Sequence, residues 1–210
     1  AAQTIAETHW LLEQAHAKGD ASIYIGAQAG STFARDAHHA ARAVVLIELE
    51  EECLGAHTGI DRGEEGSNVL GFARFRMGSA APSNLIELVK QPRTHAAALA
   101  TAKAIFAGAG FKVAVCNDVP GRIVNRLIRP YLNAVLRRLD DGLATADDMD
   151  ATLKMGLGYP EGPHALLDRT GLAHHFDVTQ ALYEWTGDPA YAPARRARIA
   201  WLNRDEGTTS

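Results

Sequence analysis

The sequence NDVPGRIVNRLIRPYLNAVLRRLDDG, residues 117–142, divides the chain into two parts of different character. After Pro120-Gly121, short strand-like runs give way to an apolar pattern with a four-residue period, which is typical of an α-helix that packs on a core. We therefore expect a helix over 122–142 that buries much of its circumference. Its main apolar row is Ile123, Leu127, Tyr131, Val135 and Leu139, and a second row is Val124, Ile128 and Leu132.

Before residue 120, strand-like runs alternate with helical patterns. This alternation predicts an α/β domain with a mainly parallel sheet over residues 1–119. Thr94 is well placed to cap the alanine-rich helix that precedes the last strand. Helices are also expected at 3–18 and 31–43. The expected strands lie at 22–27, 44–49, 68–75, 84–89 and 111–118.

Residues 120–210 contain only helical patterns and predict an all-α domain. Thr145, with Asp148 three residues later, resembles a capping box at the start of the second helix. Gly156 is expected to end that helix, because glycine adopts the left-handed conformation found at helix ends. The remaining expected helices lie at 164–174, at 176–186 and after Pro193.

The composition is that of a soluble globular protein, with 47% apolar residues, 22% charged residues and a net charge of −4. It excludes a disordered chain and provides no overall basic charge for nucleic acid. No apolar run approaches the ~20 residues that span a bilayer, and the first residues lack a signal-peptide pattern. Cys53 and Cys116 do not make a disulfide framework, so we expect a cytoplasmic protein.

Nine histidines raise the question of a metal site. His38-His39 and His174-His175 are adjacent pairs, and adjacent helical residues point about 100° apart, which suits chelation poorly. The sequence contains no HExxH or CxxC pattern. We therefore interpret the histidines as surface or helix-end residues and expect no metal.

The segment IGAQAG, residues 25–30, follows a strand-like run and precedes a helical one, where a phosphate-binding turn would lie. Glu48 or Glu50 then falls near the distance of a ribose-binding acid. The spacing omits the middle glycine that lets a backbone approach a pyrophosphate. The pattern therefore does not identify cofactor-binding residues.

Two polar residues occupy apolar patterns. Glu87 lies inside the run at 84–89, and a buried carboxylate is costly unless it is paired. Asn125 lies on the apolar row of the long helix, where its amide is able to donate to a substrate carbonyl. The alternatives are a Glu87 on an edge strand facing solvent and a first-turn Asn125 bonded to local backbone.

From residue 117 to about 192, the chain closely resembles the helical C-terminal domain of the L-3-hydroxyacyl-CoA dehydrogenases. The motifs are D-x-P-G-x-x-x-N-R, the LNAVL–DDG–A-x-x-D-x-D stretch and G-x-G-Y-P-x-G-P. Upstream, VLGFARFRMGSAAPSNLIELVKQPRT is similar to the family's V-I-G-x-H-F-F-N-P stretch and the segment after it. The resemblance implies that residues 1–119 form a partial Rossmann-like domain.

In that family, NAD oxidises the 3-hydroxyl of an acyl-CoA in fatty-acid metabolism. A histidine is the general base, a glutamate orients it, and a serine and an asparagine hold the substrate oxygen. The resemblance places the glutamate at Glu87 and the asparagine at Asn125. The histidine position falls at Ala73 and the serine position at Glu52, so two of the four groups are absent.

The resemblance implies NAD as the cofactor. It also places the run at 22–27 after the family's glycine fingerprint, so the chain is expected to begin midway through the dinucleotide-binding domain. We therefore expect little NAD binding by these residues.

The leading hypothesis is a family dehydrogenase whose oxidation is impaired in this chain. The alternative is a non-catalytic acyl-CoA-binding or dimerisation module. A third is a changed enzyme in which Glu52, Arg74 or His57 replaces the lost groups. The resemblance implies an acyl-CoA-type ligand and a homodimer joined through the helical half. We expect Asn125 and Glu87 to face one cleft between the halves.

Overall fold

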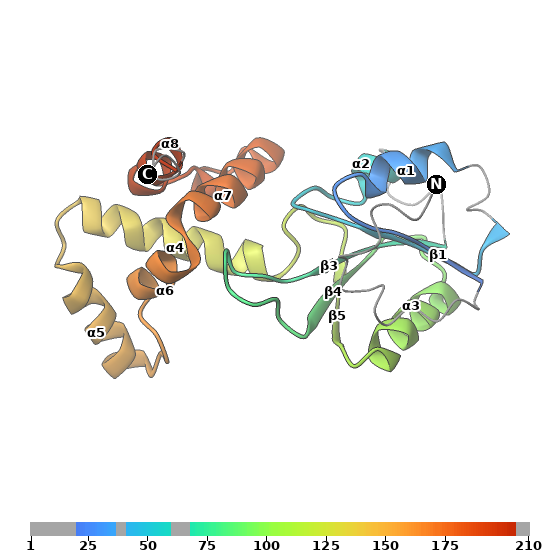
Figure 1. Ribbon diagram of the computed structural model, residues 1–210, viewed down its shortest axis with the longest axis horizontal. Helices are drawn as coiled ribbons and strands as arrows, with labels where there is room; N and C mark the ends of the chain where they lie inside the picture. Colours follow the sequence, from blue (N-terminus) through green and yellow to red (C-terminus); the bar gives the residue numbers. More distant parts are fainter. Residues whose placement is uncertain (1–19, 37–40, 60–67, 205–210) are drawn as a thin grey trace, which may run out of the picture. The chain divides into compact units, whose positions relative to one another are not determined.

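The computed structural model describes residues 20–36, 41–59 and 68–204, which divide into two compact units (Figure 1). The first unit contains the described residues up to Phe75 together with Ser83–Arg122. The second contains Arg76–Pro82 and the described residues from Ile123 onward. The helix expected at 3–18 lies outside the described residues.

A five-stranded sheet forms the centre of the first unit, in the order β1-β2-β3-β4-β5. Neighbouring strands are parallel except β3 and β4, which are antiparallel. The expected mainly parallel α/β sheet is therefore confirmed. The strands are β1 (Ala21–Tyr24), β2 (Val44–Glu48), β3 (Val69–Arg74), β4 (Leu85–Lys90) and β5 (Lys112–Asn117).

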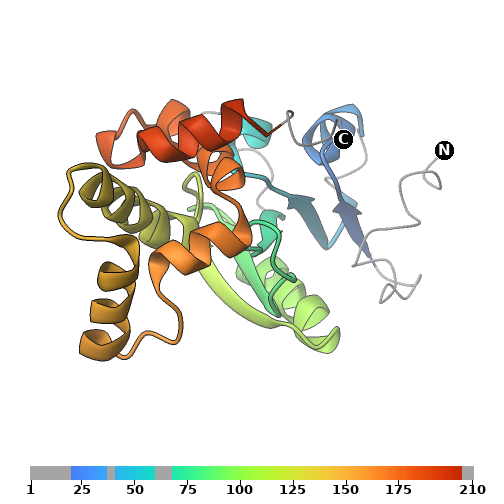
Figure 2. The ribbon, with the colours of Figure 1, turned by 60° about the vertical axis from the view of Figure 1, so that its left-hand side comes forward.

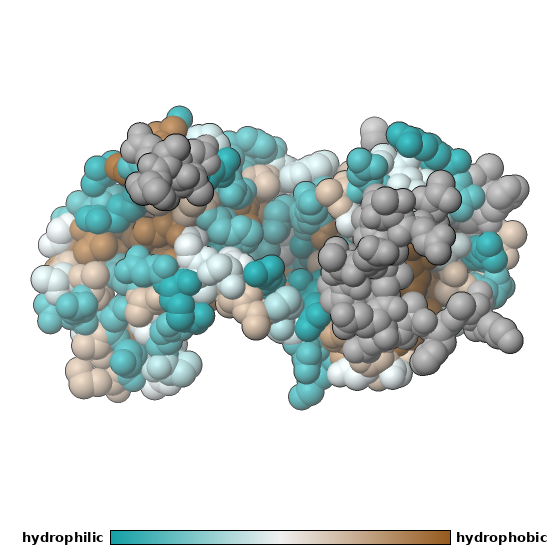
Figure 3. Space-filling view, viewed as in Figure 1, coloured by the Kyte–Doolittle hydropathy of each residue, from teal (hydrophilic) through white to brown (hydrophobic). Residues whose placement is uncertain are grey.

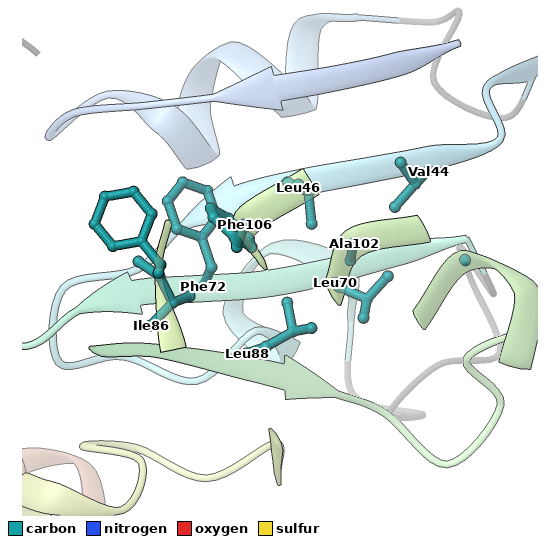
Figure 4. Packing of buried hydrophobic residues seen from close by; sticks show 10 residues of the cluster. Val44, Leu46, Leu70, Phe72, Ile86, Leu88, Ala102 and Phe106 are labelled. Carbon is teal, nitrogen blue, oxygen red and sulfur yellow. The ribbon is translucent and has the colours of Figure 1, made fainter. Parts of the chain in front are cut away.

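Both faces of this sheet are covered, which explains why its strands read as continuous apolar runs. Successive side chains of a strand point to opposite faces, so Val44 and Leu46 pack with helix α3 (Ala96–Gly108) on one side. Val45 and Ile47 pack with α1 (Ala29–Arg35) on the other. The short helix α2 (Gly55–Thr58) follows β2. Figure 4 shows the α3 side.

The second unit is all helical, as expected, and its helices are visible in Figure 2. Its core contains Leu132 and Leu136 of the long helix together with Leu167, Phe176 and Ala197. Ser79, in the segment between β3 and β4, donates its N–H to the Thr170 carbonyl at 3.0 Å, so that segment packs in this unit. The elements are α4 (Val124–Asp140), α5 (Ala146–Leu157), α6 (Pro163–Thr170), α7 (Leu172–Thr186), the 3₁₀ turn η4 (Pro189–Tyr191) and α8 (Arg195–Leu202).

The expected apolar row on α4 is wrong in part. Leu127 is 73% exposed, although the four-residue period places it in the main buried row. The buried side of α4 carries Asn125, Arg129 and Asn133 among its leucines. These polar groups are buried at acceptable cost because they hydrogen-bond one another.

Of the three predicted helix caps and ends, one is confirmed and two are wrong. Thr145 caps α5 by accepting the Asp148 N–H at 3.1 Å, as expected. Thr94 does not cap α3; its hydroxyl accepts the Gln91 N–H at 2.9 Å, and the N-cap residue is His95. The second helix does not end at Gly156 but continues to Leu157, and Gly158 follows with φ of 69°, a left-handed conformation in which glycine lacks the Cβ clash.

Among the described residues, no helix combines the length and apolar character needed to cross a membrane.

Replacing Phe106 by alanine should lower the free energy of unfolding by about 3–5 kcal/mol, because a fully buried ring leaves a cavity. Phe106 is 0% exposed, and its ring centroid lies 5.0 Å from that of Phe72. Urea denaturation followed by circular dichroism measures the change. Lys103→Ala, on the exposed side of the same helix, should shift the midpoint little. Equal midpoints for the two variants would contradict this packing.

Candidate functional site

Glu87 lies in the interior of the first unit and not on an edge strand, because β4 is paired with β3 on one side and β5 on the other. The residue is 2% exposed. Its cross-strand neighbour on β3 is Ala73, which is itself 6% exposed. The residue at the family's histidine position therefore lies directly opposite the residue at the glutamate position, and it has no ionisable group.

Arg122 lies against the Glu87 carboxylate. Its Nε is 3.7 Å from Glu87 Oε2, and its Nη2 donates to the carbonyl of Glu50 and lies 3.9 Å from the Glu51 carboxylate. The arginine side chain is 4% exposed. Arg122 has a φ of 54°, an uncommon conformation for a residue other than glycine. The backbone here is held because the Gly121 N–H donates to the Glu51 carbonyl at 3.0 Å.

Cys116, on β5, shares the surroundings of this ion pair. Burial first, and the negative charge of Glu87 second, raise the pKa of the Cys116 thiol to about 11. A thiol with so high a pKa remains protonated near neutral pH, and the thiol form is a poor nucleophile. Cys116 is therefore not a candidate for covalent catalysis.

Glu52 and His57 are two of the three residues predicted as replacements for the absent catalytic groups, and they are paired with each other. His57 Nε2 lies 3.1 Å from Glu52 Oε1. Burial raises the pKa of Glu52, but the hydrogen bonds from His57 and from backbone outweigh it, and the net pKa is lowered. Gly30 leaves room for the His57 ring, since a Cβ there would lie 2.1 Å from it. Arg74 instead donates to the Ser83 carbonyl at 2.6 Å.

The turn at 25–30 does not fit a pyrophosphate. The Gly26 N–H, the kind of donor that would face a phosphate, donates instead to Glu48 Oε2 at 2.7 Å. A carboxylate at this turn would also repel the anion. The described residues therefore provide no fit for the diphosphate of NAD at this position. Within the same part of the chain, no group of three or more His, Cys, Asp or Glu side chains is arranged to hold a metal ion.

Asn125 begins a buried chain of polar side chains in the second unit. Its Oδ1 accepts from Arg129 Nε at 3.0 Å. Arg129 Nη1 lies 2.9 Å from His175 Nδ1, and His175 Nε2 lies 3.0 Å from Asn133 Oδ1. Asn133 Nδ2 donates to the carbonyls of Ala190 and Ala192 at 3.1 and 3.2 Å. Asn125 is therefore bonded to a side chain of its own helix, Arg129.

His175 is not a surface histidine as the sequence suggested, because it is 1% exposed. Burial, and next the positive charge of Arg129, lower the pKa of His175 to about 3. The signal that was available in the sequence is the spacing of Asn125, Arg129 and Asn133. Steps of four residues put all three polar side chains on one face of the helix.

The family described as "3-hydroxyacyl-CoA dehydrogenase, C-terminal domain" matches residues 121–206. Residues 121–206 are thus similar to the C-terminal domain of the 3-hydroxyacyl-CoA dehydrogenases. The resemblance to that dehydrogenase family is thereby confirmed, and Asn125 lies inside the matched domain.

Two curated relatives show how far the similarity extends. A 3-hydroxybutyryl-CoA dehydrogenase of Bradyrhizobium diazoefficiens is 33% identical over 124 residues, which cover 57% of this chain and 42% of the relative. This alignment is longer than the matched domain, so it includes residues before 121. The mitochondrial hydroxyacyl-coenzyme A dehydrogenase of Sus scrofa is 42% identical over 88 residues, which cover 42% of this chain and 28% of the relative. The chain thus spans less than half of either relative.

Solved structures share the fold. The (S)-3-hydroxybutyryl-CoA dehydrogenase of Ralstonia eutropha aligns with a TM-score of 0.62 at 24% identity, over 78% of this chain and 56% of that one. FadB2 of Mycobacterium tuberculosis aligns with a TM-score of 0.66 at 24% identity, over 90% of this chain and 66% of that one. At this identity the alignments show a shared fold, and they do not assign a reaction to this chain.

Acid should destabilise this protein through His175. The folded protein protonates His175 only near pH 3, whereas the unfolded chain does so near its ordinary pKa of 6.5, so the unfolded state binds the extra proton between these values. The contribution of His175 to the free energy of unfolding is therefore complete above about pH 6.5. It falls below that pH, by as much as about 1.4 kcal/mol per pH unit.

Urea titrations at about pH 6.5 and about pH 5 measure this dependence, with the change in tryptophan fluorescence as the signal. His175→Gln should lose less stability over the same interval, because glutamine does not titrate. An equal loss in both proteins would show that other groups cause the acid sensitivity.

Proposed function

We propose that this chain is part of a 3-hydroxyacyl-CoA dehydrogenase-family protein that binds an acyl-CoA-type molecule and, by itself, does not carry out the family's NAD-dependent oxidation. The observation that carries the proposal is the pair Ala73–Glu87. The carboxylate in the orienting position faces an alanine across the strands and forms its ion pair with Arg122.

The chemical reason is the absence of a proton acceptor at residue 73. Oxidation of a hydroxyl requires that its proton leave as the hydride departs, and a positioned base contributes typically 10²–10⁴-fold to such a step. We do not assign this part to Glu87, because its carboxylate lies against the guanidinium of Arg122, with Nε 3.7 Å from Oε2. Glu52, at the serine position, is paired with His57.

Asn125 is the residue that we assign to the substrate oxygen. It belongs to the matched domain and corresponds to the family's substrate-binding asparagine. We do not assign the NAD of the family to residues of this chain, since the Gly26 N–H in the turn at 25–30 is bonded to the Glu48 carboxylate.

A dimerisation module is the second candidate function, and helix α5 favours it. None of the described residues of α5 is buried, and Met155 is 82% exposed on it. In Figure 3, apolar residues colour the surface at the lower left, where Figure 1 places α5. Apolar exposure of this extent is typical of a surface that a partner covers. We propose that the partner is a second copy of the chain.

The 210-residue chain should show no measurable oxidation of 3-hydroxyacyl-CoA with NAD. The assay follows the reduced-nicotinamide absorbance, with acetoacetyl-CoA and NADH as reverse substrates, and calorimetry tests NADH binding separately. Acetoacetyl-CoA should bind without turnover, and Asn125→Ala should weaken that binding. Clear turnover, or micromolar affinity for NADH, would return this chain to the active dehydrogenases. His57→Ala, made in any active preparation, would show whether the pair with Glu52 supplies the base.

Light scattering at micromolar concentration should give the mass of a homodimer. Such an interface should bury more than ~1,000 Å² of total surface. Met155→Glu should shift the protein toward monomer, because it places a charge in the proposed interface. Lys154→Gln, next to it on the same helix, changes the net charge by the same amount and controls for that change. A monomer in the unmodified protein would refute the dimer and leave the acyl-CoA assignment standing.

A further inference from the structure

Arg122 has buried hydrogen-bond donors that meet no acceptor among the described residues. Its side chain is 4% exposed, and Nη2 donates to the Glu50 carbonyl. Nε and Nη1 are buried, and within the described part of the chain neither has a hydrogen-bond partner. Nε lies 3.7 Å from Glu87 Oε2, which suits an ion pair but is too long for a hydrogen bond. Because a buried N–H of a charged group costs free energy when it is left unpaired, Nη1 requires a physical explanation.

The side chains that flank Glu87 in the sheet do not supply the acceptor. The residues before and after it on β4 belong to the core shown in Figure 4, so Glu87 points to the opposite face. Its partners on the neighbouring strands are Ala73 on β3 and Ala114 on β5. Directly paired residues share a face of the sheet, and both of these side chains end at Cβ. Neither strand therefore offers a polar side chain to Arg122 beside the carboxylate.

The backbone of Arg122 adds a second cost at the same residue. Its φ of 54° is uncommon for a residue other than glycine, which would adopt it without a Cβ clash. Conformations of this kind persist where the surroundings fix them, and they gather at functional sites. The ion pair with Glu87 involves Nε, so it does not account for the donor at Nη1. A ligand oxygen at Nη1 would account for it.

The charges around Arg122 select the kind of oxygen that suits this donor. Nε is 3.7 Å from the Glu87 carboxylate, and Nη2 is 3.9 Å from that of Glu51. Two carboxylates thus already face one guanidinium group, and they would repel a further anion. A neutral carbonyl or hydroxyl oxygen accepts a hydrogen bond without adding charge. The surroundings therefore favour an uncharged oxygen over a carboxylate or a phosphate.

We propose that Arg122 Nη1 is a ligand-binding donor that takes the uncharged oxygen at C3 of a 3-oxoacyl or 3-hydroxyacyl thioester. This inference rests on the proposed acyl-CoA-binding function and adds a specificity-determining residue to it. We choose the C3 oxygen because Ala73, opposite Glu87, occupies the position that the resemblance assigns to the base for that oxygen. A methylene at C3 leaves Nη1 unpaired, and a carboxylate at C3 meets the repulsion of Glu87 and Glu51.

The experiment compares three ligands by calorimetry on the full chain. Acetoacetyl-CoA has a ketone at C3, malonyl-CoA a carboxylate and butyryl-CoA a methylene, and all three share the CoA moiety. The unmodified protein should bind acetoacetyl-CoA about tenfold more tightly than butyryl-CoA, as expected for one hydrogen bond from a charged donor. Malonyl-CoA should bind more weakly than acetoacetyl-CoA. The ratio of dissociation constants for butyryl-CoA and acetoacetyl-CoA is the readout, because a general loss of structure weakens both ligands together.

Arg122→Lys and Glu51→Gln form the matched pair of variants. Lysine keeps the positive charge beside Glu87 but lacks the guanidinium fork, so the ratio should fall toward one. Glu51→Gln changes a carboxylate near Arg122 and leaves the guanidinium in place, so the ratio should be retained. Circular dichroism verifies that both variants are folded at the temperature of the titration. In ¹⁵N NMR of the unmodified protein, acetoacetyl-CoA should shift the Arg122 Nη signals and butyryl-CoA should not.

The outcomes separate this inference from the proposed function. If none of the three CoA esters binds the unmodified protein, the proposed function fails and this inference fails with it. If they bind and Arg122→Lys keeps the full preference for acetoacetyl-CoA, the function stands and the role of Nη1 is overturned. Tighter binding of malonyl-CoA than of acetoacetyl-CoA would overturn the assignment to an uncharged oxygen. Equal loss of the ratio in both variants, or identical Nη shifts with both neutral ligands, would also overturn the inference.

Discussion

A guanidinium group that leaves water requires acceptors in the protein, and each of the two units buries one such group. Arg122 is 4% exposed in its side chain and lies against Glu87 and the Glu50 carbonyl. Arg129, 1% exposed, donates to Asn125 and His175. Because arginine stays charged at any accessible pH, its acceptors are fixed in direction. Each arginine lies beside one side chain that the family resemblance assigns to substrate chemistry, Arg122 beside Glu87 and Arg129 beside Asn125.

Most of the fold could be predicted from the sequence because its strands are buried on both faces. The run at 44–49 contains no polar residue before Glu48, which is typical of a strand between two layers, and β2 is such a strand. Thr145 was recognisable as a cap because Asp148 stands at the required spacing. Thr94 was not distinguishable from a cap, since its hydroxyl finds the Gln91 N–H, and that choice depends on the turn before α3.

The candidate site was predictable only in its individual residues. The sequence indicates Glu87 and Asn125 as polar residues in apolar patterns, and both are buried. Their partners were not foreseen. Arg122 lies against Glu87, and its own backbone has a positive φ. An arginine in a sequence does not predict that conformation. His175 lies 42 residues from Asn133, and only the packing of α7 on α4 brings them together.

The surroundings of Glu87 differ from those that the family resemblance implies for a glutamate that orients a catalytic base. A carboxylate at 2% exposure requires a cation or several hydrogen-bond donors. Loss of such a partner without a replacement would leave an uncompensated buried charge. Ala73, opposite it, offers neither, and Arg122 supplies the cation from the segment after β5. Glu87 therefore has an alanine opposite it on β3 and a guanidinium group beside its carboxylate. A carboxylate committed to a permanent guanidinium stabilises the fold where the resemblance implies that it orients a base.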